Sequence, residues 1–390
     1  MTYWELIVIF CALAALPLAL LVGSGTRHGK RKVTTVVVVL AILVVLTVIF
    51  DSLIIAAGFV EYGEATLSGI MLWKAPIEDL SYVVAGALLL PALWWALRRP
   101  GHVWGQVTTW FATSRPISWV NTAYPFAAAY FLATGRVDDV LVIGTLFFLI
   151  PYNLMMYGIN DVFDYESDLR NPRKGGVEGA LVDRSQHRGI LVASVLISLP
   201  FVLYLLISGD LAAGIVMAVS LFAVVAYSLE GLRFKEIPFL DSATSATHFV
   251  SPMVYGLVIA GVPWSWSMMA VTCAFFLWGM ASQAFGAVQD VEADRAGGLS
   301  SIATVLGARS TVWVAAGMYL AAGILLLFTA WPTPVAALFV LPYVANLVPF
   351  LRIHDAACET ANLGWKRFLW INYVVGFAVT MLLIYSRVTA

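Results

Sequence analysis

LVIGTLFFLIPYNLMMYGINDVFDYESD, residues 141–168, joins a long apolar run to a dense group of acidic side chains. The apolar part, residues 141–159, has nearly the ~20 residues that a helix needs to cross a bilayer. Asp161, Asp164 and Asp168 follow at helical spacing, and a continued helix would hold them within an arc of roughly 60°. The stretch therefore predicts a membrane helix that ends in a stripe of carboxylates.

The composition of the whole chain is typical of a polytopic membrane protein. Of its 390 residues, 61% are hydrophobic and only 12% are charged, whereas soluble domains carry about 25% charged residues. The formal net charge of −1 says little about partners; for a membrane protein of this kind we expect no nucleic-acid partner. The three cysteines lack a metal-binding spacing, so we interpret them as packing residues.

About twelve apolar runs are long enough to span a membrane, which predicts an all-α protein. They lie near residues 4–22, 33–54, 79–97, 117–134, 138–158, 190–208, 210–229, 246–262, 266–287, 311–330, 332–351 and 368–386. We do not interpret the first run as a cleaved signal peptide, because its start is acidic and no convincing cleavage site follows.

Positive charge in the loops predicts how the chain is oriented in the membrane. All but three of the 22 Lys and Arg residues fall on one side of the predicted spans, and the three on the other side are Lys74, Arg136 and Arg387. Since Lys and Arg accumulate in cytoplasmic loops, we expect a multi-pass protein of the cell membrane with both termini outside. The acidic stripe then faces the cytoplasm.

A polar and aromatic connector predicts two domains. Residues 99–116 interrupt the series of apolar runs after the third one. We therefore expect a three-helix domain over residues 1–98 and a nine-helix domain over residues 117–390.

The acidic stripe has two interpretations. Three carboxylates on one helix face repel one another, and a divalent cation would compensate them. Oxygen ligands without His or Cys favour magnesium, which commonly binds one or two carboxylates together with phosphate oxygens. Alternatively the stripe is a solvated loop whose acids pair with Arg170, Arg173 and Lys174.

A second acidic segment favours the metal. Asp290 and Asp294 are one helical turn apart at the end of another apolar run, on the same predicted side of the membrane. Each acidic segment is followed by basic residues and glycines. Carboxylates that hold cations, with basic side chains nearby, are what a metal-bridged diphosphate requires.

These segments resemble the UbiA-type intramembrane prenyltransferases. Residues 160–168 match the family's NDxxDxxxD motif, and residues 290–294 match its DxxxD motif. SRPISW at 114–119 and YSLEGLRFKEIPFLD at 227–241 also resemble the family. The resemblance covers roughly residues 110–390 and implies a helical bundle around a cavity open to lipid. It also implies transfer of a prenyl group from a magnesium-bound prenyl diphosphate to an apolar acceptor.

The resemblance assigns roles by position. The expected metal ligands are Asn160, Asp161, Asp164, Asp168, Asp290 and Asp294. The candidate diphosphate ligands, each of which could instead be a membrane anchor, are Arg115, Lys174, Arg233, Lys235 and Arg295, with Asn160 beside them. Tyr157 and Tyr227 are candidates to line the cavity and stabilise an allylic cation through their ring faces, unless they serve only in packing.

The N-terminal domain resembles the three-helix lycopene cyclase subunits of bacteria. Asp51, Tyr62 and the segment 76–79 stand where those proteins carry an aspartate, a WxY-like segment and a PxEE element. Val60 and Asp79 depart from the pattern. Glu78 and Asp79 are the candidate acids and bases for ring closure, because a carboxyl group in a low-dielectric site can hold a proton; alternatively Asp79 caps a helix. Since such subunits work in pairs, the resemblance implies a second small cyclase subunit.

The combination of the two domains is similar to the lycopene elongases fused to a cyclase subunit in actinobacteria that make fifty-carbon carotenoids. It implies transfer of a dimethylallyl group from dimethylallyl diphosphate to the ends of lycopene, within the lipid bilayer. An alternative is an aromatic or glycerol-lipid acceptor, with the N-terminal helices as an anchor. A transporter would place ionisable residues near mid-membrane, whereas those of the nine-helix domain gather at one surface.

Overall fold

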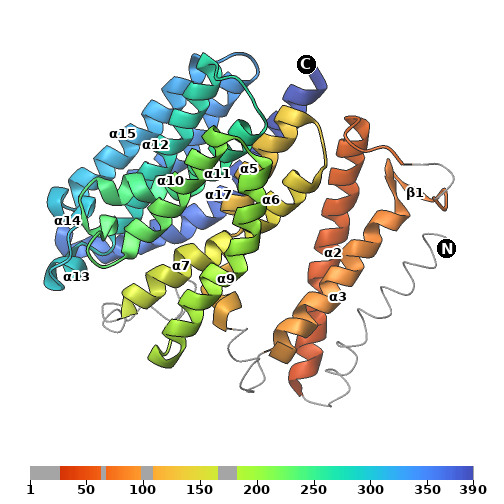
Figure 1. Ribbon diagram of the computed structural model, residues 1–390. Helices are drawn as coiled ribbons and strands as arrows, with labels where there is room; N and C mark the ends of the chain where they lie inside the picture. The colour runs from red at the N-terminus through yellow and green to blue at the C-terminus, as the bar shows by residue number, and fades with distance from the viewer. Residues whose placement is uncertain (1–26, 63–66, 98–108, 166–181, 390) are drawn as a thin grey trace. The chain divides into compact units, whose positions relative to one another are not determined.

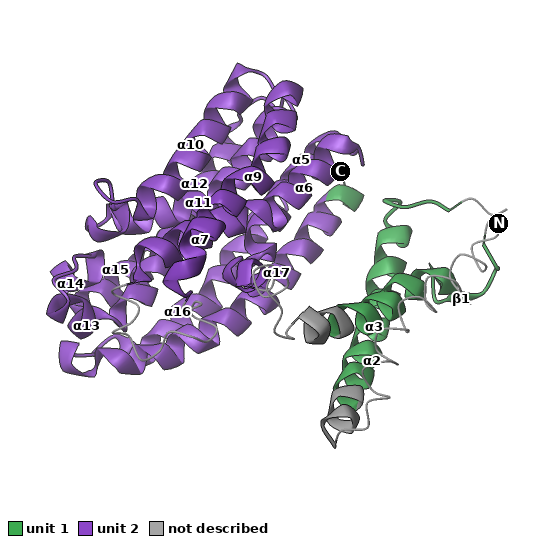
Figure 2. Cartoon of the chain, turned by 60° about the horizontal axis from the view of Figure 1, so that its bottom comes forward, with its two compact units in different colours: residues 1–108, 387–390 green, residues 109–386 purple. Residues whose placement is uncertain are grey.

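The computed structural model describes residues 27–62, 67–97, 109–165 and 182–389. The chain divides into two compact units (Figure 2). Unit 1 comprises residues 1–108 with 387–390, and unit 2 comprises residues 109–386. Asp168 and Lys174 lie outside the described residues.

In its described residues, unit 1 contains two long helices and a small hairpin (Figure 1). Its elements are α2 (Arg27–Ala56), β1 (Met71–Leu72), β2 (Ala75–Pro76), the 3₁₀ helix η2 (Ile77–Asp79) and α3 (Leu80–Leu97). The two helices pack together. The backbone N–H of Lys74, in the hairpin turn, donates to Ser52 Oγ of α2 at 3.1 Å, and this bond ties the hairpin to the helix pair.

Unit 2 is a helical bundle. Its elements are η3 (Pro116–Ser118), α5 (Val120–Thr134), α6 (Asp139–Leu149), α7 (Pro151–Phe163), α9 (Arg184–Ser208), α10 (Leu211–Ser228), η4 (Phe234–Glu236), α11 (Leu240–Ile259), α12 (Trp266–Val288), α13 (Val291–Ala296), α14 (Ile302–Leu306), α15 (Ala308–Leu327), η5 (Thr333–Val340), α16 (Leu341–Leu347), η6 (Val348–Phe350), η7 (Asp355–Ala361) and α17 (Asn362–Thr389). One apolar core joins α5, α6, α7, α9, α10 and α11, and the other joins the elements from α12 to α17.

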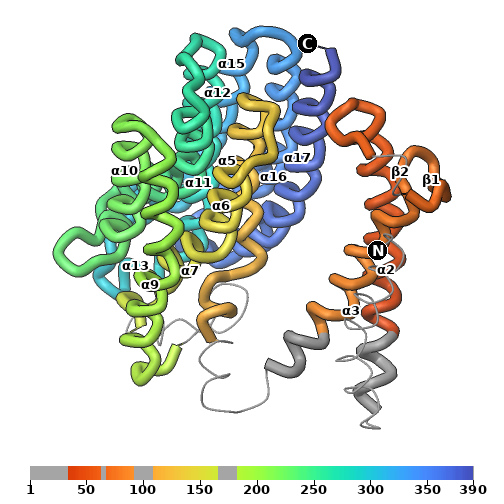
Figure 3. The backbone as a smooth tube through the Cα atoms, turned by 45° about the vertical axis from the view of Figure 1, so that its right-hand side comes forward, coloured from red at the N-terminus to blue at the C-terminus, as the bar shows by residue number. Residues whose placement is uncertain are grey.

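Helix α11 connects the two halves of the bundle. It packs against α5, α10 and α12, and α12 in turn runs beside α15 (Figure 3). Gly256 of α11 lies so close to α5 that a Cβ atom there would be 2.8 Å from the backbone oxygen of Phe126. Small residues at such crossings allow membrane helices to approach closely.

The close approach of α5 and α11 predicts that a larger residue at position 256 destabilises the protein. Gly256→Ala is expected to lower the apparent Tm of the detergent-purified protein, because separating α5 from α11 costs about 1–3 kcal/mol. Gly317→Ala on α15 is the control, since a Cβ there meets nothing within 4 Å and alanine favours the helix by up to ~1 kcal/mol. Equal Tm values for the two variants would contradict the packing argument.

The membrane spans agree in part with expectation. Eight helices in the described part of the chain are long and apolar enough to cross a membrane. Of the remaining predicted spans, residues 4–22 lie outside the described residues, while 79–97, 117–134 and 246–262 correspond to the helices α3, α5 and α11. The chain is therefore a multi-pass membrane protein, and a total of about twelve spans stays a prediction.

Candidate functional site

The first acidic segment lies at the C-terminal end of α7. Asn160 and Asp161 belong to the last turn of this helix, and Asp164 is its C-cap, with its N–H bonded to the carbonyl of Asn160 at 2.9 Å. The Asp161 residue is only 2% exposed. Since α7 ends at Phe163, the structure places Asn160, Asp161 and Asp164 at one helix end.

Arg115 is held against this helix end. Its Nη2 atom donates to Asp161 Oδ1 at 2.8 Å, and its guanidinium lies 4.2 Å from the centroid of the Tyr157 ring. The backbone of Arg115 has φ +49°, a left-handed conformation that is uncommon for a residue with a side chain and concentrates at functional sites. One face of Tyr157 is thus covered by a cation.

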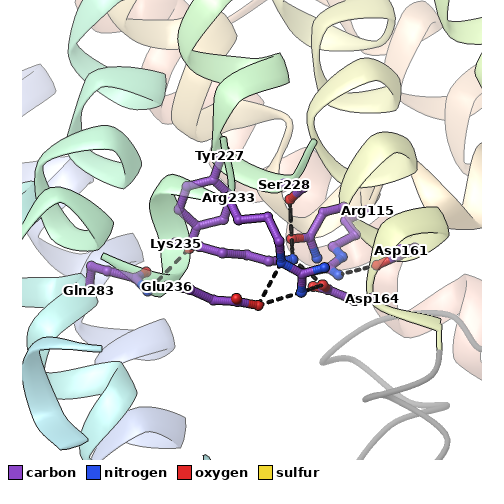
Figure 4. Close-up of polar contacts among 10 residues, drawn as sticks. Arg115, Asp161, Asp164, Tyr227, Ser228, Arg233, Lys235, Glu236 and Gln283 are labelled. Carbon is purple, nitrogen blue, oxygen red and sulfur yellow. Dashed lines mark hydrogen bonds and ion pairs between the residues drawn. The ribbon is translucent and has the colours of Figure 1, made fainter. Parts of the chain in front are cut away.

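The loop after α10 brings two more basic groups to Asp164. Lys235 Nζ contacts Asp164 Oδ1 and lies 3.4 Å from Asn160 Oδ1, while Arg233 Nη2 lies 3.8 Å from Asp164 Oδ1. Ser228 Oγ donates to Asn160 Oδ1 at 2.8 Å. Figure 4 shows Ser228, Arg233 and Lys235 converging on the end of α7 near Asp164.

The basic side chains of this group favour an anionic ligand, and its carboxylates favour a ligand that binds together with divalent cations. Burial lowers the pKa of Lys235, and the carboxylate of Asp164 opposes this shift. The carboxylates of Asp161 and Asp164 are paired with three basic side chains, which are Arg115, Arg233 and Lys235. The donor set of Asn160, Asp161 and Asp164 consists only of oxygen atoms, which fits magnesium better than zinc or copper.

The second acidic segment begins directly after α12. Asp290 is the N-cap of α13, and Asp294 lies within that helix. The preceding Gln289 accepts a hydrogen bond from Asn362 Nδ2 at 2.6 Å, and its backbone oxygen accepts one from the Cys358 thiol at 3.7 Å. These bonds fix the segment to η7 and α17.

A series of contacts connects the first acidic segment to α12, the helix that precedes the second acidic segment. Gln283 of α12 donates to the hydroxyl of Tyr227 on α10 at 3.4 Å, and Tyr227 is followed by Ser228, which binds Asn160. The Tyr227 ring also packs edge to face on His248, with centroids 5.3 Å apart. Among the described side chains, no three His, Cys, Asp or Glu residues lie together as a single metal site. A direct bridge between Asp164 and Asp294 therefore stays a prediction.

Arg295 has a different environment from the other basic candidates. Its guanidinium donates to Asp355 Oδ2 at 2.6 Å and to the carbonyl of Thr304. Asp355 Oδ1 in turn accepts from the N–H of Ala308 at 2.7 Å. Arg295 thus ties α13 to α14 and η7, and through Asp355 to the start of α15.

The candidate acids of unit 1 are buried. Glu78 is 7% exposed and Asp79 is 9% exposed. Glu78 Oε1 accepts from the backbone N–H of Ser68 at 2.6 Å, and Asp79 Oδ2 accepts from the Tyr62 hydroxyl at 2.8 Å. Asp79 is the last residue of η2 and directly precedes α3.

Sequence reasoning missed several members of these groups. Ser228 lies within the quoted segment 227–241, and so does Glu236, whose Oε1 atom accepts from Arg233 Nε at 2.7 Å. Their positions beside Tyr227 and Lys235 therefore gave a signal. Tyr82, which donates to Asp51 Oδ2 at 2.8 Å, gave none, because an aromatic residue in an apolar helix is usually a packing residue.

Comparison with known proteins identifies two families. The sequence model of the UbiA prenyltransferase family matches residues 122–372, and that of lycopene cyclase matches residues 2–95. The chain is 51% identical over 386 residues to the C(50) beta-cyclic carotenoids biosynthesis protein LbtBC of Dietzia sp. (strain CQ4), covering 89% of each chain. It is 53% identical over 272 residues to a lycopene elongase/hydratase of Corynebacterium glutamicum, covering 70% of this chain and 95% of that one.

The fold has solved neighbours. A UbiA homolog from Archaeoglobus fulgidus, bound to DMAPP and Mg²⁺, superposes with a TM-score of 0.51 at 17% identity. The match covers 68% of this chain and 98% of the homolog. At this identity the likeness concerns the fold alone.

Proposed function

The chain belongs to the UbiA prenyltransferase family, and from this membership we propose that unit 2 transfers a dimethylallyl group from dimethylallyl diphosphate to the ends of lycopene. The relatives with about half their residues in common are named for carotenoid biosynthesis and for lycopene elongation. An apolar acceptor is consistent with a multi-pass membrane bundle, because lycopene would stay in the lipid.

The observation that carries the proposal is the convergence of Arg115, Arg233 and Lys235 on the acidic end of α7. Asn160, Asp161 and Asp164 would hold magnesium there, together with Asp168, Asp290 and Asp294. Bound magnesium would supply charge neutralisation to the diphosphate and make it a better leaving group. The basic side chains would orient the diphosphate and take up the negative charge that develops as the C–O bond breaks.

The proposed prenyl transfer needs no oxidant or reductant. The allylic C–O bond of dimethylallyl diphosphate breaks, and inorganic diphosphate leaves with the electron pair. A terminal double bond of lycopene forms the new C–C bond and becomes a tertiary cation. This cation loses a proton, takes up water, or closes a ring. The ring of Tyr227, and the face of Tyr157 opposite Arg115, would stabilise positive charge along this route.

Unit 1 is proposed to act in cyclisation of the elongated ends. Its sequence matches the lycopene cyclase family, and it carries two buried carboxyl groups, Glu78 and Asp79. We expect a second small cyclase subunit to complete it. By the charge distribution of the loops, the prenyl-transfer site faces the cytoplasm and both termini face outside.

The test is expression of the chain in a lycopene-producing host, with pigments analysed by chromatography and mass spectrometry. Products that are five and ten carbons larger than lycopene are expected. Unchanged lycopene, together with prenylation of an added aromatic or glycerol-lipid acceptor in the same membranes, would instead support the other acceptor class.

Two basic residues with different surroundings give a further prediction. Lys235→Gln is expected to raise the KM for dimethylallyl diphosphate about ten- to a hundredfold, because hydrogen bonds to charged groups contribute ~1.5–3 kcal/mol. Arg295→Gln is expected to lower the apparent Tm and to leave this KM within about twofold, because its partners are Asp355 and Thr304. Steady-state kinetics in membranes and thermal unfolding distinguish the two effects. A KM that rises equally in both variants would contradict the assignment.

A further inference from the structure

Two tyrosine–carboxylate pairs meet in unit 1. The Tyr62 hydroxyl donates to Asp79 Oδ2, and the Tyr82 hydroxyl donates to Asp51 Oδ2, each at 2.8 Å. The four residues come from α2, from the segment after α2, from η2 and from α3. The two pairs are neighbours, because Asp79 and Tyr82 lie three residues apart where η2 leads into α3, and the charge of Asp51 acts to raise the pKa of Asp79.

Glu78 adds an atom that the protein itself does not satisfy. Its Oε1 atom accepts from Ser68, whereas its Oε2 atom is buried and has no hydrogen-bond partner among the described residues. The whole residue is more than nine-tenths buried. An unsatisfied carboxylate oxygen in such a place is costly, and it leaves Glu78 an acceptor atom that can take up a proton.

We propose that Tyr62 and Tyr82 are positioning residues for proton transfer during ring closure, with Asp79 as the proton donor and Glu78 Oε2 as the proton acceptor. The inference rests on the cyclase function proposed for unit 1. Tyr62 occupies Oδ2 of Asp79, which leaves Oδ1 to carry the proton. Tyr82 fixes the carboxylate of Asp51, whose negative charge favours a protonated Asp79.

The environments of Asp79 and Glu78 support their roles as proton donor and proton acceptor. Burial raises the pKa of Asp79, and the charges of Asp51 and Glu78 add to the rise, while the Tyr62 hydrogen bond opposes it. Burial also acts to raise the pKa of Glu78, but the bonds from Ser68 outweigh it and leave this pKa below its ordinary value. Two neighbouring acids with opposite pKa shifts are suited to work as acid and base.

The proposed step conserves electrons. The Asp79 proton adds to one carbon of the terminal double bond, which leaves a tertiary cation on the other carbon. The π electrons of a second double bond attack this cation and close the ring. A ring C–H proton then leaves to Glu78 Oε2 and restores a double bond, so the net change is an isomerisation. Transfer of that proton from Glu78 to Asp79 restores the starting state.

The test uses allelic replacement in the strain that encodes the chain, so that any partner subunit is present. Tyr62→Phe and Tyr82→Phe keep the rings and remove only the hydroxyl groups. Each is expected to lower the ratio of cyclic to acyclic elongated carotenoids about tenfold or more, with the total of elongated products unchanged. Tyr373→Phe, an exposed tyrosine of α17, is the control and should match the parent strain.

The pH profile of ring formation in isolated membranes distinguishes positioning from simple loss of structure. Among the described residues, the charged or titratable groups that act on Asp79 are Asp51, Tyr62, Glu78 and Tyr82. Loss of the Tyr62 donor raises the pKa of Asp79, so the alkaline limb should move to higher pH. Loss of Tyr82 frees Asp51 to move away from Asp79, so the alkaline limb should move to lower pH.

Two outcomes overturn the inference in distinguishable ways. If Asp79→Asn abolishes ring formation while Tyr62→Phe and Tyr82→Phe keep the product ratio within about twofold, or lower it without shifting the limb, the tyrosines have no positioning role. If Glu78→Gln and Asp79→Asn both leave ring formation intact, the cyclase function of unit 1 itself fails, and the inference fails with it.

Discussion

Asp161→Ala and Asp290→Ala are each expected to abolish elongation of lycopene while leaving the protein inserted in the membrane. Asp161 is buried at the end of α7 and holds Arg115, so its loss removes a proposed metal ligand and releases a proposed diphosphate ligand together. Loss of transition-state charge stabilisation of this kind lowers rates by roughly a hundredfold to a thousandfold for a single group. We expect at least that loss, because the metal and the basic side chain act together.

The measurement is the yield of elongated carotenoids per amount of membrane-inserted protein. Glu292→Ala is the matched control, because Glu292 lies in the same acidic segment as Asp290 and its side chain is exposed. This variant should elongate lycopene at the parent rate. Elongation that persists in Asp161→Ala or Asp290→Ala would remove the basis of the metal assignment.

The second large effect is expected in unit 1. Glu78→Gln combined with Asp79→Asn should stop ring formation and leave elongation intact, because the proposed transfer residues all belong to unit 2. The amides keep the size of the side chains but hold no transferable proton. General acid–base groups typically contribute about a hundredfold to ten-thousandfold, so cyclic products should fall below a few per cent of the total.

Pigment analysis checks this directly, since acyclic fifty-carbon products should replace the cyclic ones. Glu61→Gln is the control, because Glu61 is an exposed acid just before Tyr62. Loss of elongation in the double variant would show that the two activities are not separable as proposed. An unchanged cyclic fraction would leave unit 1 with the role of a membrane anchor.

The helices of the bundle were largely predictable from hydropathy. Long apolar runs correspond to α9, α10, α12 and α15 within a few residues, because each one must bury or shield a hydrophobic surface in lipid. The end of α7 was harder to predict. Regular spacing suggested a helix that continues through Asp168; α7 ends at Phe163 with Asp164 as its C-cap, and Asp168 lies outside the described residues. The carboxylate of Asp164 contacts Arg233 and Lys235. Lys235 lies 71 residues further along the chain, so the spacing of residues within α7 could not predict these contacts.

The basic residues show a similar limit. Arg115, Arg233 and Arg295 are equivalent by charge and by predicted side of the membrane. The structure separates them, because the first two reach the end of α7 whereas Arg295 is bonded to Asp355 and Thr304. The sequence gives the sign of each charge, but it does not show which group each charged side chain contacts.

The sequence by itself determined that this chain is a helical membrane protein with two acidic segments, since both features depend on residues that are close together along the chain. Only the tertiary structure decided that Lys235 and Arg233 reach Asp164 and that Tyr82 holds Asp51. The physical reason is that an ion pair or a hydrogen bond acts over about 3 Å. Lys235 and Asp164 are 71 residues apart in the chain, and Tyr82 and Asp51 are 31 residues apart. Such pairs come within this distance only when the chain folds.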